Sequence, residues 1–341
     1  MRRKLVCIAK GELAWQEYED APLQPGQVRV LAEFAAAKHG TEMAFYKGYA
    51  NPRGPYDPEF KLHRPERERS PYPFNIGNML VGPVIEAGPG VTRVALGERV
   101  CVYSGFSETR VVHEDQCWKM SPAMSWKTAV CLDPAEFAFA AVRDGHVRLG
   151  DAVAVFGMGA IGLMAVQLAR LAGASQVIAL DPLPNRRALA EQLGATLTLD
   201  PTACDAGLEI KKATDKRGAD VIIDYSGAMP AVQHALRGIA YGGNVVLGSF
   251  PPAYGAGLDL GAEAHMNVPN IIFSRACSQP DRDHPRWDEP RIFRTVWSLL
   301  CGGALTGEPV VQPVVARADL PAAYADIASH PEKNVKLGVI F

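Results

Sequence analysis

The sequence predicts an α/β protein, with a doubly wound parallel sheet in its middle third and a mostly β domain before it. From about residue 125, short and wholly apolar runs alternate with helical patterns, as in parallel sheets that helices cover on both faces. The first hundred residues instead show short runs separated by turn residues. A glycine-rich turn at residues 157–162 joins the first apolar run to the first helical pattern.

The N-terminal part is expected to form a compact, mostly β domain. Residues 5–8, 27–32 and 83–87 are short apolar or alternating runs, and Pro and Gly residues separate them. Residues 48–73 differ, because they are rich in Pro, Arg, Glu and Tyr and follow neither a helical nor a strand period. Such a stretch is either a solvated surface loop or a loop that covers a substrate, with His63 and Arg64 as its polar candidates.

The middle of the chain alternates strands and helices as a Rossmann fold does. We expect strands at 152–156, 176–180, 221–224 and 244–247, and helices at 160–171, 185–193 and 229–239. An amphipathic helix at 291–300 and a strand at 335–341 follow. The predicted domains are residues 1–125, completed by 274–341, and residues 126–273.

The glycine turn has the sequence Gly157-Met158-Gly159-Ala160-Ile161-Gly162. Gly157 permits the tight turn, Gly159 lets the backbone approach a pyrophosphate, and Gly162 lets the helix lie close to the strand. The start of the helix, at Ala160 and Ile161, offers N–H groups and a partial positive charge to the phosphates. The turn therefore predicts a dinucleotide site, against the plainer reading of a turn that binds nothing.

The choice between NAD and NADP depends on Asp181, which ends the next predicted strand nineteen residues after Gly162. Its carboxylate can accept both hydroxyls of the adenosine ribose and would repel a 2′-phosphate, which favours NAD. Arg186 lies close behind it and can offset part of that repulsion, so NADP is the second possibility.

Composition excludes several classes of partner. The net charge of −2 and the pI near 6.5 give no electrostatic support for nucleic-acid binding. No apolar run reaches the length of a membrane span or of a signal-peptide core. The seven scattered cysteines contain no CxxC pair, which is typical of free thiols in a reducing compartment. We expect a cytoplasmic protein without nucleic-acid or membrane partners.

Three motifs carry a resemblance to a known family: the spaced Gly and Val residues from Gly77 to Val100, the glycine turn, and residues 242–248. On them the chain resembles the medium-chain dehydrogenase/reductase superfamily, in its branch of zinc-type alcohol, polyol and threonine dehydrogenases. The resemblance implies a GroES-like catalytic domain, a Rossmann domain, hydride transfer with NAD, and a homodimer or homotetramer that associates through the nucleotide domain. It also implies that Ser226, Gly248 and Ser274 lie beside the cofactor.

The residues at the family's zinc positions are largely replaced. His39 stands where the family has a zinc-binding cysteine, and Asn78 and Met79 stand where it has His and Glu. Asp133 lies where polyol dehydrogenases have a Glu. The four closely spaced cysteines of the family's structural zinc are also missing. His39 and Asp133 can bind zinc, but a catalytic zinc needs three protein ligands, so we expect the metal to be absent.

Without zinc, another group must take the hydroxyl proton as the hydride leaves. His39 is the first candidate, because histidine titrates near neutral pH, and Lys38 is the second. By resemblance, Thr41 matches a relay hydroxyl and Glu42 an acid behind the site. Each also has a structural reading: His39 as a core side chain, Lys38 as a surface lysine, and Glu42 as the partner of an arginine.

The expected substrate is rich in hydroxyl groups, such as a sugar, a cyclitol or a polyol. Asn78, Asp133 and Glu136 are its candidate contacts, together with Lys38 and His39. The leading prediction is a zinc-independent oxidoreductase that interconverts a secondary alcohol and a ketone. An NADPH-dependent reductase of activated C=C bonds and a non-catalytic nucleotide-binding protein are the alternatives.

Overall fold

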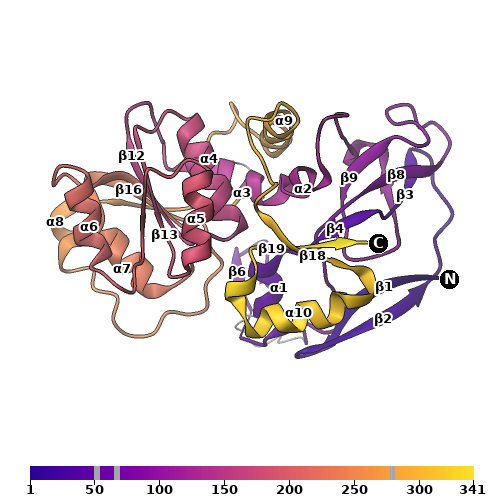
Figure 1. Cartoon of the computed structure of the whole chain (residues 1–341), viewed down its shortest axis with the longest axis horizontal. Coiled ribbons are helices and arrows are strands. Elements are labelled where there is room, and N and C mark those ends of the chain that lie inside the picture. The colour runs from indigo at the N-terminus through magenta and orange to yellow at the C-terminus, as the bar shows by residue number, and fades with distance from the viewer. Residues whose placement is uncertain (50–53, 65–69, 277, 279–280) are drawn as a thin grey trace. The chain divides into compact units, whose positions relative to one another are not determined.

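The computed structural model describes residues 1–49, 54–64, 70–276, 278 and 281–341, and for His39 the backbone alone (Figure 1). Contacts divide it into two compact units. The β-rich unit comprises residues 1–120 and 313–341, and the nucleotide unit comprises residues 121–312. By contacts, residues 274–312 group with the nucleotide unit, whereas the predicted domains assign them to the first, so those bounds stay a prediction.

The β-rich unit is built on antiparallel strands. A three-stranded sheet has the order β2–β1–β7, and an eight-stranded sheet has the path β10–β3–β8–β4–β19–β18, in which β9 also pairs with β8, and β11 pairs with β9. The bounds are β1 (Arg2–Ala9), β2 (Glu12–Tyr18), β3 (Gln27–Leu31), β4 (Phe34–Ala36), β7 (Phe74–Asn75), β8 (Met79–Ala87), β9 (Arg99–Tyr103), β10 (Thr109–His113), β11 (Trp118–Lys119), β18 (Val311–Ala316) and β19 (Lys336–Ile340). The strands expected at 5–8 and 83–87 lie within β1 and β8, and those expected at 27–32 and 335–341 overlap β3 and β19.

The end of the chain packs into the same core as its beginning. Strand β19 pairs antiparallel with β4, with Gly338 opposite Ala36. Helix α1 (His39–Tyr46) and helix α10 (Leu320–Ser329) share an apolar cluster with β1, which contains Tyr46 and Tyr324 in edge-to-face contact at 5.2 Å. The C-terminal residues are therefore part of the environment of α1.

The described part of residues 48–73 contains a small hairpin of β5 (Tyr56–Asp57) and β6 (Leu62–His63). The guanidinium of Arg64 lies 3.0 Å from the carboxylate of Asp57, across the base of this hairpin. Residues 50–53 and 65–69 lie outside the described residues, so a substrate-covering role for this loop stays a prediction.

The nucleotide unit contains a parallel sheet of the predicted type. Its strand order is β14–β13–β12–β15–β16–β17, which is the order 3-2-1-4-5-6 of a Rossmann fold. The strands are β12 (Ala152–Phe156), β13 (Gln176–Leu180), β14 (Leu197–Leu199), β15 (Ala219–Asp224), β16 (Ile239–Leu247) and β17 (Asn270–Phe273). All five residues of β12 are buried, as expected for a central parallel strand. The α/β fold class is confirmed.

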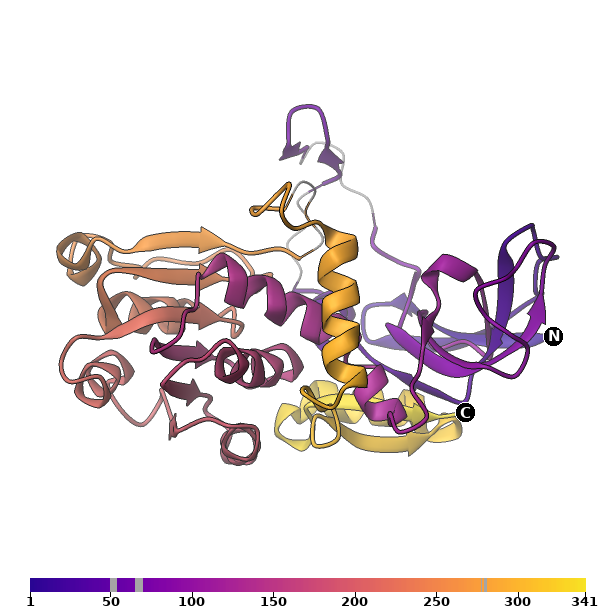
Figure 2. The same ribbon diagram turned by 90° about the horizontal axis from the view of Figure 1, so that it is seen from above.

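Helices lie on both faces of this sheet (Figure 1 and Figure 2). The helices of the nucleotide unit are α2 (Trp126–Ala129), α3 (Leu132–Asp144), α4 (Ala160–Leu171), α5 (Pro184–Gln192), α6 (Ala206–Ala213), α7 (Met229–Gly238), α8 (Glu263–Asn267) and α9 (Glu289–Cys301), of which α9 packs against α3. Four of them match the predicted helices within two residues at either end. Across the described residues, no helix combines the length and the apolar character that a bilayer crossing requires.

Candidate active site

The glycine turn between β12 and α4 leaves no room for side chains at two positions. Gly157 has φ +88°, and a Cβ there would lie 2.6 Å from the amide nitrogen of Ser226. A Cβ on Gly162 would lie 1.9 Å from the carbonyl oxygen of Gly157. The turn is thus pressed against the end of β15 on one side and against the first turn of α4 on the other.

Gly159 has the opposite environment. An added Cβ there meets no heavy atom within 4 Å, and Gly159 caps α4 without any side-chain hydrogen bond. The first-turn residues Ala160 and Ile161 follow directly. An open surface beside the start of a twelve-residue helix fits a pyrophosphate, because the helix end offers N–H groups and positive potential to anions.

Asp181 lies directly after β13 and is buried. Its Oδ2 accepts a hydrogen bond from the amide of Met158 at 2.8 Å, and its Oδ1 accepts one from Leu183 at 2.9 Å. Arg186 Nη1 is 3.8 Å from Oδ2, whereas the next arginine, Arg187, donates to the Asp181 carbonyl at 2.7 Å. The carboxylate is therefore held beside the glycine turn with one guanidinium next to it.

The other predicted cofactor residues follow neighbouring strands at the same edge of the sheet. Ser226 comes after β15, Gly248 after β16 and Ser274 after β17. A Cβ on Gly248 would lie 2.6 Å from the ring of Tyr225, so this position also requires glycine. Carboxyl ends of parallel strands are where doubly wound folds bind ligands.

Asp224, the last residue of β15, hydrogen-bonds the predicted cofactor residue Ser226 and was not among the residues predicted from the sequence. It is fully buried, and its carboxylate accepts hydrogen bonds from the amide of Ser226 at 2.9 Å and from the Ser226 hydroxyl at 2.5 Å. Burial raises the pKa of the Asp224 carboxyl, and the hydrogen bonds from Ser226 act against that rise. An acidic residue that ends an apolar strand is the sequence signal that points to it.

Two of the predicted substrate residues belong to the nucleotide unit. Asp133 and Glu136 are both buried on α3, with Asp133 in the first turn of that helix. Lys38 and Asn78 belong to the β-rich unit. The structure does not bring the two pairs together in one unit, so a shared role in binding substrate stays a prediction.

In the β-rich unit, the predicted catalytic residues lie at the start of α1. Lys38 precedes the helix and is half-buried, and Thr41 and Glu42 lie in the first turn. The side chain of His39 lies outside the described residues. Glu42 is buried: its Oε1 accepts from the amide of Gly77 and its Oε2 from the hydroxyl of Tyr324, each at 3.0 Å.

Asn78 has a rigid backbone and an unsatisfied side chain. Its backbone N–H donates to the carbonyl oxygen of Ala36 at 2.9 Å, and its backbone carbonyl oxygen accepts from the N–H of Ser104 at 3.0 Å. Its Nδ2 is buried and, among the described residues, has no hydrogen-bond partner. Buried polar groups in native proteins are almost always paired, so this N–H group is suited to a ligand.

Among the described side chains, which do not include that of His39, no complete donor set for a catalytic zinc is present. Asn78 presents an amide nitrogen, and Met79 is fully buried in β8. Within the described ranges, no three His, Cys, Asp or Glu side chains form a group that would hold a metal ion. A catalytic zinc needs three protein ligands from the imidazole, thiolate and carboxylate classes.

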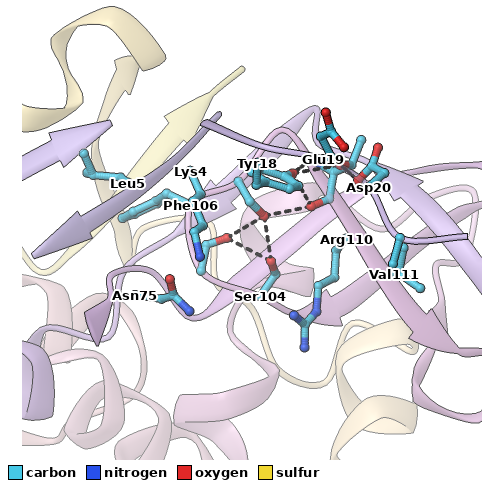
Figure 3. A pocket seen from close by; sticks show the side chains of 14 residues that line it. Lys4, Leu5, Tyr18, Glu19, Asp20, Asn75, Ser104, Phe106, Arg110 and Val111 are labelled. Carbon is cyan, nitrogen blue, oxygen red and sulfur yellow. Dashed lines mark hydrogen bonds between the residues drawn. The ribbon is translucent and has the colours of Figure 1, made fainter. Parts of the chain in front are cut away.

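A separate cavity of about 240 Å³ lies in the β-rich unit (Figure 3). Tyr18, Asp20, Ser104, Thr109 and Arg110 are among its lining residues. Polar groups of its lining are hydrogen-bonded to one another. The hydroxyl oxygens of Tyr18 and Thr109 are 2.8 Å apart, and the Thr109 hydroxyl donates to the carboxylate of Asp20 at 2.6 Å. None of the predicted site residues lines this cavity.

Comparison with known proteins identifies the family to which the chain belongs. Residues 160–279 match the model described as zinc-binding dehydrogenase. A D-guloside 3-dehydrogenase of Escherichia coli (strain K12) is 44% identical over 350 residues, which is 99% of this chain and 100% of that protein. An (R,R)-butanediol dehydrogenase of Bacillus subtilis is 27% identical over 280 residues, covering 74% of this chain and 76% of that protein.

Solved structures agree on the fold. The crystal structure of 2R,3R-butanediol dehydrogenase from Bacillus subtilis superposes with a TM-score of 0.80 at 22% identity, over 100% of both chains. Galactitol-1-phosphate dehydrogenase from Escherichia coli gives a TM-score of 0.80 at 18% identity, over 99% of this chain and 100% of that one. The relatives' activities correspond to the first of the three predicted functions, and they imply a nicotinamide cofactor. The chain belongs to the zinc-type alcohol dehydrogenase-like branch of the medium-chain dehydrogenase/reductase superfamily, and is an oxidoreductase that acts on CH–OH groups.

Proposed function

We propose that the protein oxidises a secondary hydroxyl of a sugar or glycoside with NAD as the hydride acceptor and without a catalytic zinc. The full-length similarity to a D-guloside 3-dehydrogenase carries the substrate class. The amide of Asn78 and the buried thioether of Met79, at positions where the family has zinc ligands, support independence from the metal.

The test is NAD reduction with a panel of methyl glycosides, with the keto product identified by NMR. We expect turnover with at least one glycoside and little with simple aliphatic alcohols. Absence of turnover with every glycoside, together with NADPH oxidation by enones, would favour the C=C reductase instead.

A bound nicotinamide would supply the acceptor for the hydride of the carbinol carbon. The chain must take the hydroxyl proton as that hydride leaves, and we assign this step to His39, with Lys38 as the second candidate and the Thr41 hydroxyl as the relay. Asn78 Nδ2 donates a hydrogen bond to the substrate oxygen, which stabilises the negative charge that develops there. Asp133 and Glu136 are proposed to contact the other hydroxyls of the substrate.

The proposed preference for NAD rests on Asp181. Asp181→Asn removes the negative charge with little change of side-chain shape, so repulsion of a 2′-phosphate falls, while the positive charge of Arg186 remains next to residue 181. We expect the ratio of kcat/KM for NAD to that for NADP to fall at least about tenfold, a change of about 1.4 kcal/mol. Asp151→Asn, at the turn before β12, is the control and should leave the ratio unchanged. An unaltered ratio in Asp181→Asn would show that this carboxylate does not select the cofactor.

We also propose a cytoplasmic homodimer or homotetramer that associates through the nucleotide unit. The edge strand β17 exposes Ile271 and Phe273, at 44% and 73%. Exposed apolar edge strands pair readily with another chain. In a dimer with two-fold symmetry, the edge strand of one copy pairs with the same strand of the other copy. The described cysteines are all free thiols, which supports a reducing compartment.

Phe273→Glu is expected to convert the oligomer into a smaller species in analytical ultracentrifugation, because a charge would be buried at the interface. Leu149→Glu changes another exposed apolar residue of the same unit, 88% exposed in a turn, and should leave the mass unchanged. A wild-type protein that sediments as a monomer contradicts the proposal.

A further inference from the structure

Two oppositely charged side chains are buried in the β-rich unit beneath the proposed catalytic residues. Glu42 is 8% exposed and Lys336 is 2% exposed. Charges in a protein interior are costly unless they are paired and hydrogen-bonded. The proposed chemistry uses neither Lys336 nor Tyr324, the residue that hydrogen-bonds Glu42.

Three hydrogen bonds hold this cluster together. Glu42 accepts from the Gly77 amide and from the Tyr324 hydroxyl at 3.0 Å each. Lys336 Nζ donates to the carbonyl of Ala37 at 2.7 Å. Burial raises the pKa of the Glu42 carboxyl, while the Tyr324 hydroxyl and the charge of Lys336 lower it. The cluster thus joins α1 to the segment before β8 and to the C-terminal elements α10 and β19.

Two of these three contacts reach a residue that directly precedes a proposed site residue. Ala37, held by Lys336, precedes Lys38, and Gly77, held by Glu42, precedes Asn78. Gly77 is also confined sterically, since it has φ +99° and an added Cβ would lie 2.5 Å from the backbone nitrogen of Phe106. The Glu42 carboxylate therefore supports the Ile76–Gly77 peptide, which directly precedes Asn78.

We propose that Tyr324 and Lys336 are positioning residues, which hold the start of α1 and the Gly77–Asn78 peptide in one arrangement through Glu42 and Ala37. This inference rests on the proposed function, because it is Lys38, His39 and Asn78 whose geometry is maintained. Groups that orient metal ligands typically change activity about 10- to 100-fold when they are removed, and we expect an effect of the same order from these two residues.

Two variants test the hydroxyl and the charge separately. Tyr324→Phe removes only the hydroxyl that Glu42 accepts, and Lys336→Met removes only the ammonium. Tyr46→Phe is a matched control, because Tyr46 packs against Tyr324 in the same core but donates its hydroxyl to Gly11 at 3.1 Å. Lys336→Arg restores the positive charge and serves as the rescue.

Two readouts are measured on each variant of the full chain. In Tyr324→Phe and Lys336→Met we expect kcat with a glycoside to fall about 10- to 100-fold, with KM for NAD within about twofold of wild type. Hydrogen exchange of the peptide that contains Gly77 should become at least about tenfold faster. Tyr46→Phe should change neither value, and Lys336→Arg should recover most of kcat.

The proposal is overturned if both variants behave as Tyr46→Phe does, or if exchange at Gly77 rises while kcat is unchanged. If the wild-type protein turns over no glycoside, the proposed function fails, and the exchange rates alone decide whether the cluster holds the Gly77–Asn78 peptide. The two failures are therefore distinguishable.

Discussion

A Gly162→Ala variant is expected to lose measurable NAD binding and to unfold at a lower temperature than the wild-type protein. The new Cβ would lie 1.9 Å from the carbonyl oxygen of Gly157, so α4 must move away from β12. Because the obstacle is backbone, no side-chain rotation relieves it, and we expect a loss of about 3 kcal/mol in the free energy of unfolding. Calorimetry and titration with NAD measure the two effects.

Two other glycine substitutions separate the effect on stability from the effect on NAD binding. Gly159→Ala adds a methyl group in open space, so it should keep the unfolding temperature and weaken NAD binding, because the methyl occupies the surface where the pyrophosphate would lie. Gly255→Ala is equally unhindered, lies outside the turn and should change neither property. Wild-type affinity for NAD in Gly162→Ala would show that the close approach of α4 to β12 is not required for binding.

The second large effect is expected from His39→Ala. Loss of a group that takes the substrate proton typically lowers kcat about 10²- to 10⁴-fold, and NAD binding should be unchanged. Alanine is also a good helix former, so the first residue of α1 keeps its backbone. Two quantities are measured: kcat with a glycoside, and the Kd for NAD by fluorescence titration.

Lys38→Met is the companion variant. A large fall in kcat in Lys38→Met with normal kcat in His39→Ala would assign the proton transfer to Lys38 and leave His39 as a packing residue. Unchanged kcat in both variants would contradict the proposed chemistry at the start of α1.

The nucleotide unit was largely predictable because its signals are local. The central strand β12 is uniformly apolar, and the glycine turn follows directly after it. Strand β14 was missed because it has only three residues, all half-buried, with a polar residue in the middle. Helix α3 and strand β17 were also missed.

The candidate site was predictable only where motifs of neighbouring residues mark it. The resemblance located Lys38 to Glu42 and Asn78, but the partners of this segment come from the far end of the chain. Tyr324 is 282 residues from Glu42, and Lys336 is 299 residues from Ala37. No spacing in a single sequence predicts such a contact, because it depends on how β19 and α10 pack against α1.

The most direct test of the central claim is turnover by metal-free protein. The protein is treated with a chelator, its zinc content is measured, and NAD reduction is followed with the glycoside that the panel assay identifies. The account predicts full activity with far less than one zinc per chain. Activity that disappears with the metal and returns when zinc is restored would contradict it.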